Sequence, residues 1–169
     1  MNYPESTYEI LAFKALKREV TDAWMEWAIE MIENGYETEH LLVLAGISKP
    51  YNQFYLDELT AKVFQELALD WSSQQEVLSN YSAYLAGEAL DGKRSYREVL
   101  RTLKDICIEL NYEETLMDFY LLFFALDDLV SLEKQVYWPN ATRENINEII
   151  ADYFRSWRDE QYGRENSNR

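Results

Sequence analysis

The residues from Leu116 to Val130, LMDFYLLFFALDDLV, constrain the fold of this chain more than any other stretch. Eight consecutive apolar or aromatic residues, Phe119 to Leu126, lie between Asp118 and the acidic pair Asp127 and Asp128. On a helix, these side chains divide between two opposite faces. One face holds Phe119, Leu122, Phe123 and Leu126, and the other holds Tyr120, Leu121 and Phe124. The stretch therefore predicts a central helix that is packed on nearly all sides.

The rest of the chain also has the pattern of amphipathic helices, with apolar residues every three or four positions. Serine followed three residues later by glutamate, the signature of a capping box, occurs at Ser6, Ser73 and Ser95. Predicted helices cover about 7–34, 39–45, 50–70, 73–91, 95–110, 112–130 and 143–161. The sequence therefore predicts an all-α fold, a single compact bundle of about seven helices.

A chain of 169 residues with 47% hydrophobic content is long enough to bury one core. We expect one domain over residues 1–162, followed by a frayed polar tail at residues 163–169. The single cysteine, Cys107, lies on the apolar face of its predicted helix, where it is expected to serve packing. The N-terminus has no signal-peptide pattern, and no apolar run reaches membrane-spanning length, so a cytoplasmic location without membrane insertion is expected.

The net charge of −15 is concentrated in parts of the chain. Between Lys104 and Lys134 there are eight acidic residues and no lysine or arginine, and the segment between Arg18 and Lys49 is likewise acidic without a base. Such a field repels nucleic acids and anionic lipid surfaces and favours encounter with a cationic protein. The alternative is that the acidic residues only keep an apolar-rich chain in solution.

The sequence lacks the motifs of several common chemistries. There is no glycine-rich phosphate loop, no Cys-x-x-Cys and no His-Glu-x-x-His. The only histidine, His40, is expected near the start of a helix as a surface residue and not as a metal ligand. We therefore assign no catalytic, cofactor-binding or metal-binding residue and expect no cofactor. Whether the chain is an enzyme is left open, although the missing motifs favour a protein that is not one.

One helix is basic, in contrast to the rest of the chain. The cationic residues of this helix and of the turn before it are Lys93, Arg94, Arg97, Arg101 and Lys104. They are expected to offset acidic neighbours within the fold or in a dimer, and the alternative is a site for a small anion.

The segment from Ser131 to Asn140 loses helical periodicity and contains Tyr137, Trp138 and Pro139. Aromatic residues on a connection can anchor a protein partner when they are exposed. The alternative is that both rings fold back over the end of the core.

The second half of the chain resembles the nuclease-type colicin and pyocin immunity proteins. The similar features are a helix VLRTLKDIC at Val99–Cys107, an acidic helix opening Glu113-Glu114, the triplet Tyr137-Trp138-Pro139, and a final helix with the pattern I-x-x-I-I…W-R at Ile146–Arg158. That family consists of small acidic four-helix bundles that neutralise a basic nuclease through the acidic helix and two tyrosines. In this chain Trp138 replaces the second tyrosine, the aspartate that the family carries just before the aromatic pair is replaced around Lys134 and Gln135, and the first 94 residues have no counterpart.

Two functions of different class follow as hypotheses. The first is an acidic helical module, similar to an inhibitor or a scaffold, that binds a basic protein; its oligomeric state is left open. The residues expected to contact that partner are Glu113, Glu114, Asp118, Tyr137 and Trp138. The alternative is a small-molecule-binding protein or enzyme with a pocket between helices. Its lining would include Trp24, Trp27 and Tyr81 with a carboxylate such as Glu30.

Overall fold

The computed structural model describes residues 3–167, which form eight α-helices and one short 3-10 helix and contain no strand. The all-α prediction is confirmed, with eight helices where about seven were expected. The helices are α1 (Thr7–Ala15), α2 (Asp22–Glu33), α3 (Glu39–Ala45), α4 (Gln53–Glu66), α5 (Gln74–Leu90), α6 (Tyr96–Glu109), η1 (Glu114–Leu116), α7 (Met117–Ser131) and α8 (Ile146–Ser167). None of the described helices combines the length and apolarity needed to cross a lipid bilayer.

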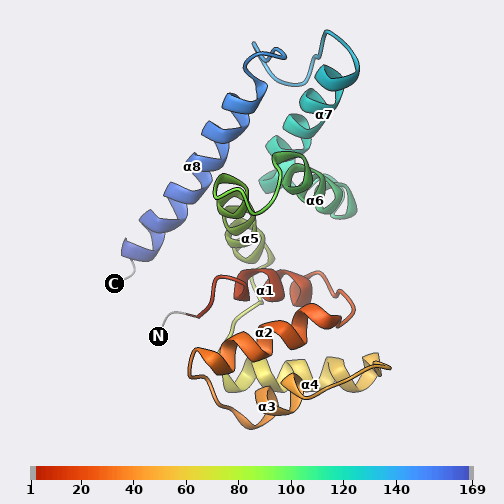
Figure 1. The fold of residues 1–169 in the computed structure, drawn as a ribbon, viewed down its shortest axis with the longest axis vertical. Helices are drawn as coiled ribbons and strands as arrows, with labels where there is room; N and C mark the ends of the chain where they lie inside the picture. The colour runs from red at the N-terminus through yellow and green to blue at the C-terminus, as the bar shows by residue number, and fades with distance from the viewer. Residues whose placement is uncertain (1–2, 168–169) are drawn as a thin grey trace. The chain divides into compact units, whose positions relative to one another are not determined.

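The chain divides into two compact units, Met1–Tyr81 and Ser82–Arg169 (Figure 1). Helix α5 runs through the boundary, so its first turns belong to the first unit and its later turns to the second. A single domain over residues 1–162 stays a prediction. Helix α8 extends to Ser167, beyond the expected end near Gln161, and the last two residues of the predicted frayed tail lie outside the described residues.

In the first unit, α2 packs against α1 and α3, and α3 packs against α4. A cluster of aromatic rings forms the centre of this core. Trp24 stacks on Phe64 with ring centroids 5.8 Å apart, Trp27 meets the same ring edge-on at 6.0 Å, and Trp71 approaches it at 5.1 Å. Aromatic packing therefore links α2 and α4. Such ring contacts stabilise a core by more than the buried apolar area alone accounts for.

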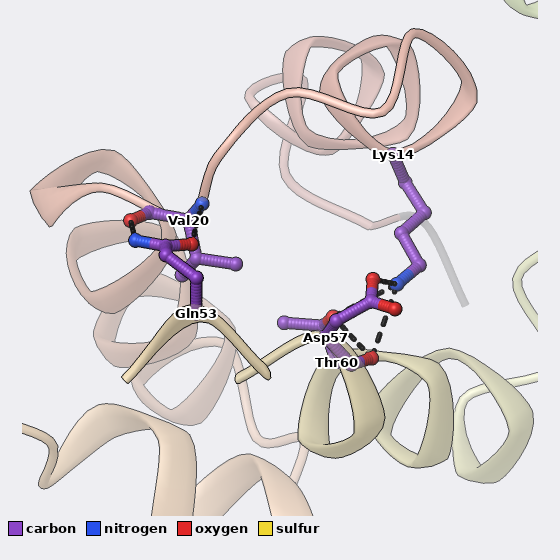
Figure 2. A network of polar contacts seen from close by, with 5 residues as sticks. All are labelled: Lys14, Val20, Gln53, Asp57 and Thr60. Atoms are coloured by element: carbon purple, nitrogen blue, oxygen red, sulfur yellow. Dashed lines mark hydrogen bonds and ion pairs between the residues drawn. The ribbon is translucent and has the colours of Figure 1, made fainter. Parts of the chain in front are cut away.

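The single long helix predicted for residues 7–34 is wrong, because the chain leaves the helical path between α1 and α2. Lys17 has a positive φ of 54°, which ends α1. The side-chain amide of Gln53 then pairs with both backbone groups of Val20, accepting from its N–H at 2.9 Å and donating to its carbonyl at 2.9 Å (Figure 2). These bonds replace the backbone hydrogen bonds that Val20 would make in a continuous helix. The N–H and the carbonyl of Val20 therefore keep hydrogen-bond partners where the helix is interrupted.

Lys14, near the end of α1, reaches across to α4. Its ammonium donates to the Asp57 carboxylate at 2.7 Å and to the Thr60 hydroxyl at 3.1 Å (Figure 2). The Thr60 hydroxyl donates in turn to the Asp57 carbonyl at 3.1 Å. This network fixes the direction of α1 relative to α4, and it uses a lysine side chain that is only 13% exposed.

Two further expectations for the first unit are corrected. Ser6 forms no capping bond, because it already has helical φ and ψ and its hydroxyl donates to the carboxylate of Glu30. Glu30 is consequently half-buried. The helix expected over residues 50–70 is shorter, and Phe54 in the first turn of α4 is 79% exposed. Helix α4 ends at Glu66, before Ala68 with its positive φ of 52°.

In the second unit, α6, α7 and α8 pack against one another. The capping box predicted at Ser95 is confirmed: its hydroxyl accepts from the Glu98 N–H at 3.2 Å, and the Glu98 carboxylate accepts from the Ser95 N–H at 2.8 Å. At Ser73, which belongs to the first unit, the hydroxyl accepts a longer bond from the Glu76 N–H at 3.4 Å. The buried residues of α8 are Ile146, Ile150, Ala151 and Phe154.

Helix α7 packs against both α6 and α8. The expected packing on nearly all sides is found on one face only. Phe119 and Leu122 on that face are fully inaccessible, whereas Tyr120, Leu121 and Phe124 on the opposite face are half-buried. The helix begins at Met117, later than expected, because Asn111 and Tyr112 both have positive φ and the chain then makes the short helix η1. The less buried face of α7 is therefore available for contacts at the surface.

Candidate protein-binding surface

Four aromatic side chains follow one another along the less buried face of α7. Tyr112 meets Tyr120 at 5.7 Å between ring centroids, Tyr120 meets Phe124 at 4.9 Å, and Phe124 meets Tyr137 at 5.5 Å. Tyr112 is 53% exposed, and the other three rings are half-buried. We call Tyr112, Tyr120, Phe124 and Tyr137 the aromatic row. Its members come from the turn after α6, from the first half of α7 and from the connection to α8.

Carboxylates lie at the start of α7, beside the Tyr112 end of the aromatic row. Glu113 and Glu114 follow Tyr112 directly in the chain, and Glu114 is exposed. The Glu113 carboxylate accepts from the Thr115 hydroxyl at 3.0 Å, so it is fixed in place by η1. Negative charge at this position also suits the positive end of the helix dipole.

Asp118, in the first turn of α7, is exposed and accepts a hydrogen bond from the Tyr153 hydroxyl of α8 at 3.1 Å. Burial is the main reason why the pKa of Tyr153 is raised, and the nearby negative charge of Asp118 raises it further. Trp138 meets the same tyrosine edge-on, with ring centroids 5.7 Å apart. Tyr153 therefore brings Asp118 and Trp138 together, although they are distant in the sequence.

The connection that carries Tyr137 and Trp138 is held by Gln135. The amide oxygen of Gln135 accepts from the N–H groups of both aromatic residues at 2.8 Å, and its nitrogen donates to the carbonyls of Trp138 at 2.6 Å and Ala141 at 3.2 Å. Arg143 adds bonds to the carbonyls of Leu129 and Leu132. Both rings consequently fold back against α7 and α8 and remain half-buried.

The five residues expected to contact a partner thus fall into two neighbouring groups. Tyr137 belongs to the aromatic row, and Glu113 and Glu114 flank its far end, whereas Asp118 and Trp138 meet at Tyr153. Sequence reasoning missed the other three members of the row. The spacing of four between Tyr120 and Phe124 is a usable signal for a shared face, but the position of Tyr112 depends on the left-handed turn at Asn111 and Tyr112.

The basic helix is largely neutralised by neighbouring acidic residues. Lys93 pairs with Glu88 at 2.7 Å, Arg97 with Asp127 of α7, and Lys104 with the adjacent Asp105. Arg97 and Lys104 also lie over the ring of Phe123, with the Lys104 ammonium 4.8 Å from the ring centroid. Asp127 is therefore paired with Arg97 of α6. It lies in the second half of α7, away from the carboxylates at the start of that helix.

Cys107 packs in the core as expected, whereas His40, expected at the surface, is half-buried and paired with Glu66. The ring nitrogen Nδ1 of His40 lies 2.5 Å from the Glu66 carboxylate, which joins the start of α3 to the end of α4. Cys107 is fully buried, and burial raises the pKa of its thiol. Among the described residues, no group of three or more histidine, cysteine, aspartate or glutamate side chains is arranged to hold a metal ion.

The aromatic residues of the alternative pocket are used for packing. Trp24, Trp27 and Tyr81 are at most 2% exposed, and the two tryptophans meet each other edge-on at 6.4 Å. The Trp27 indole donates to the Thr7 hydroxyl at 3.0 Å, and the Tyr81 hydroxyl donates to Glu9 at 3.1 Å. The indole N–H of Trp24 is buried without a hydrogen-bond partner in the described part of the chain. The three side chains pack in the core and give no support to a ligand pocket at this place.

Comparison with known proteins gives no match to a family model, to a curated protein or to a solved structure.

Proposed function

We propose that the aromatic row, together with Glu113, Glu114 and Asp118, binds a basic protein. The observation that carries the proposal is the row itself, because four rings in mutual contact lie partly open to solvent beside carboxylates. Aromatic side chains in such positions supply much of the binding energy in protein interfaces. Acidic side chains around them favour a partner with positive charge.

The distribution of charge supports a cationic partner. The interval between Lys104 and Lys134, which supplies three of the four rings of the aromatic row, contains eight acidic residues and no lysine or arginine. An arginine-rich partner suits the rings as well, because a guanidinium stacks on the face of tyrosine or phenylalanine. Nucleic acids and anionic membranes are disfavoured by the same field. A cytoplasmic location is part of the proposal.

The resemblance to nuclease immunity proteins points in the same direction. In those proteins an acidic helix and two adjacent aromatic residues bind the basic toxin, and the corresponding features here are Glu113-Glu114 and Tyr137-Trp138. An inhibitor or scaffold function would follow from this kinship. The present proposal depends only on the geometry and charge of the surface.

The test begins with recovery of bound proteins from the native cells at low salt, followed by calorimetry on each purified pair. We expect a basic protein whose affinity falls as salt rises. Tyr112→Ala and Glu114→Gln should each weaken binding, by about tenfold for the tyrosine, and both are exposed enough to leave the fold intact.

The controls are matched exposed residues of the first unit. Phe54→Ala removes an aromatic ring that is 79% exposed, and Glu58→Gln removes an exposed carboxylate. Neither should change the affinity. A partner that binds Tyr112→Ala and Glu114→Gln as tightly as the wild-type protein, or that loses affinity equally with the control variants, would contradict the proposal.

A further inference from the structure

A pocket of about 550 Å³ lies where the turn after α5 meets the outer side of α6. It is lined by Lys93, Arg94, Glu98, Arg101 and Thr102. Its volume is within the range of small-molecule sites, about 300–1,000 Å³. Because the lining residues are charged or polar, the pocket suits a polar, charged ligand better than an apolar one.

The cationic side chains reach the pocket from two segments. Lys93 and Arg94 belong to the turn, whereas Arg101 is an exposed residue on the second turn of α6. Both arginines act on the same carboxylate, because the positive charges of Arg94 and Arg101 help to hold the pKa of Glu98 below its ordinary value, after the larger effect of its bonds to Ser95. The two guanidinium groups therefore flank one small space.

The acidic residues near the pocket are already engaged within the protein. The Glu98 carboxylate accepts from the N–H of Ser95 at 2.8 Å and from its hydroxyl at 2.7 Å, which places it against the start of α6. Glu88 pairs with Lys93. The helix N-terminus is thus capped by the chain's own carboxylate and is not the feature that would hold a ligand. The lining of three cations and one carboxylate remains positive, in a chain of net charge −15.

We propose that this pocket binds a phosphate group, free or carried by a small molecule. A guanidinium matches two phosphate oxygens with parallel N–H donors, and two arginines from different segments can hold a tetrahedral dianion from two sides. A dianion also gains more from Arg94 and Arg101 than it loses to the single charge of Glu98. The volume leaves room for a group attached to the phosphate. The inference is independent of the protein-binding surface.

The experiment is an NMR titration of the full chain at pH 7.5 with inorganic phosphate, with AMP and with sodium chloride at matched ionic strength. We expect saturable shifts of the backbone amides of residues 93–102 with phosphate compounds and none with chloride. Tighter binding of AMP than of inorganic phosphate would assign the site to a phosphorylated compound, and equal binding would assign it to free phosphate.

Arg101→Gln should weaken the binding at least about tenfold, which corresponds to about 1.4 kcal/mol. The control is Arg155→Gln, which removes an exposed arginine that is paired with Asp152 on α8. It should bind as the wild-type protein does. The proposal is overturned by shifts that do not saturate, by equal shifts with chloride, or by an Arg101→Gln variant with unchanged affinity.

Discussion

At the scale of single residues, Gln135 has the largest number of hydrogen bonds in the connection between α7 and α8. Gln135→Ala would leave the N–H groups of Tyr137 and Trp138 without their partner in a half-buried segment. We expect a loss of about 1–3 kcal/mol in the free energy of unfolding, measured with urea. Val136→Ala, at a neighbouring side chain that is 89% exposed, should change it by less than about 0.5 kcal/mol. Equal effects of both substitutions would contradict this role of Gln135.

Glu66 gives the first unit a stability that depends on pH. Its carboxylate accepts from the His40 backbone N–H at 3.1 Å, and the hydrogen bond with the His40 ring is the main reason why its pKa is lowered. Because the folded-state pKa lies below the unfolded one, the contribution is fully present above about pH 4.3 and is lost as pH falls through the folded-state value.

Urea unfolding at pH 7 and pH 3 should therefore show that Glu66→Gln is less stable than the wild-type protein at pH 7, and that this difference narrows at pH 3. Glu58→Gln, at an exposed position of the same helix, serves as the comparison and should differ little from the wild type at either pH. A difference for Glu66→Gln that does not change with pH would contradict the assignment.

At the scale of elements, one sequence pattern has three different outcomes. The Ser-x-x-Glu pattern forms a complete capping box at Ser95, a single long bond at Ser73 and no capping bond at Ser6. Sequence alone cannot separate these cases, because the outcome depends on backbone angles and on distant partners such as Glu30.

Ser95→Ala should cost about 0.5–2 kcal/mol of unfolding free energy, because it removes the bond from the Glu98 N–H to the serine hydroxyl and the bond from that hydroxyl to the Glu98 carboxylate. Ser73→Ala should cost less, since it removes only the bond of 3.4 Å. Urea unfolding of both variants, with Ser95→Asp as a variant that restores a capping acceptor, checks the order. A larger loss at Ser73 than at Ser95 would contradict it.

The elements that the sequence predicts well are those set by local signals. Helix α3 has the expected bounds, Glu39–Ala45, and helical spacing correctly divides the apolar residues of α7 into two faces, although it does not show that only one of them is buried. The break between α1 and α2 could not be predicted, because the apolar spacing continues through it and the Gln53 amide that stabilises it lies 33 residues from Val20. Similarly, the spacing of Tyr120 and Phe124 predicts that these two rings of the aromatic row share a face of α7. The place of Tyr112 in the row could not be predicted, because it depends on a turn with positive φ.

At the scale of the whole molecule, the boundary between the two units lies inside a helix and not in a linker. Tyr81 and Ser82 are buried and part of α5. Limited digestion with chymotrypsin should therefore spare Tyr81 and cut first in the connection after α7, where Leu132 is 59% exposed and outside the helix. Mass spectrometry of the first fragments checks this. An early cut after Tyr81 would show that α5 opens at the boundary.

The placement of the five tryptophans makes the two units distinguishable by fluorescence. Trp24 and Trp27 lie fully inside the ring cluster of the first unit and Trp71 at its edge, whereas Trp138 and Trp157 belong to the second unit and are half-buried. In a variant with phenylalanine in place of Trp138 and Trp157, tryptophan emission would come only from the first unit. The unfolding curve of this variant, compared with that of the wild-type protein, would give each unit its own optical signal without an added label.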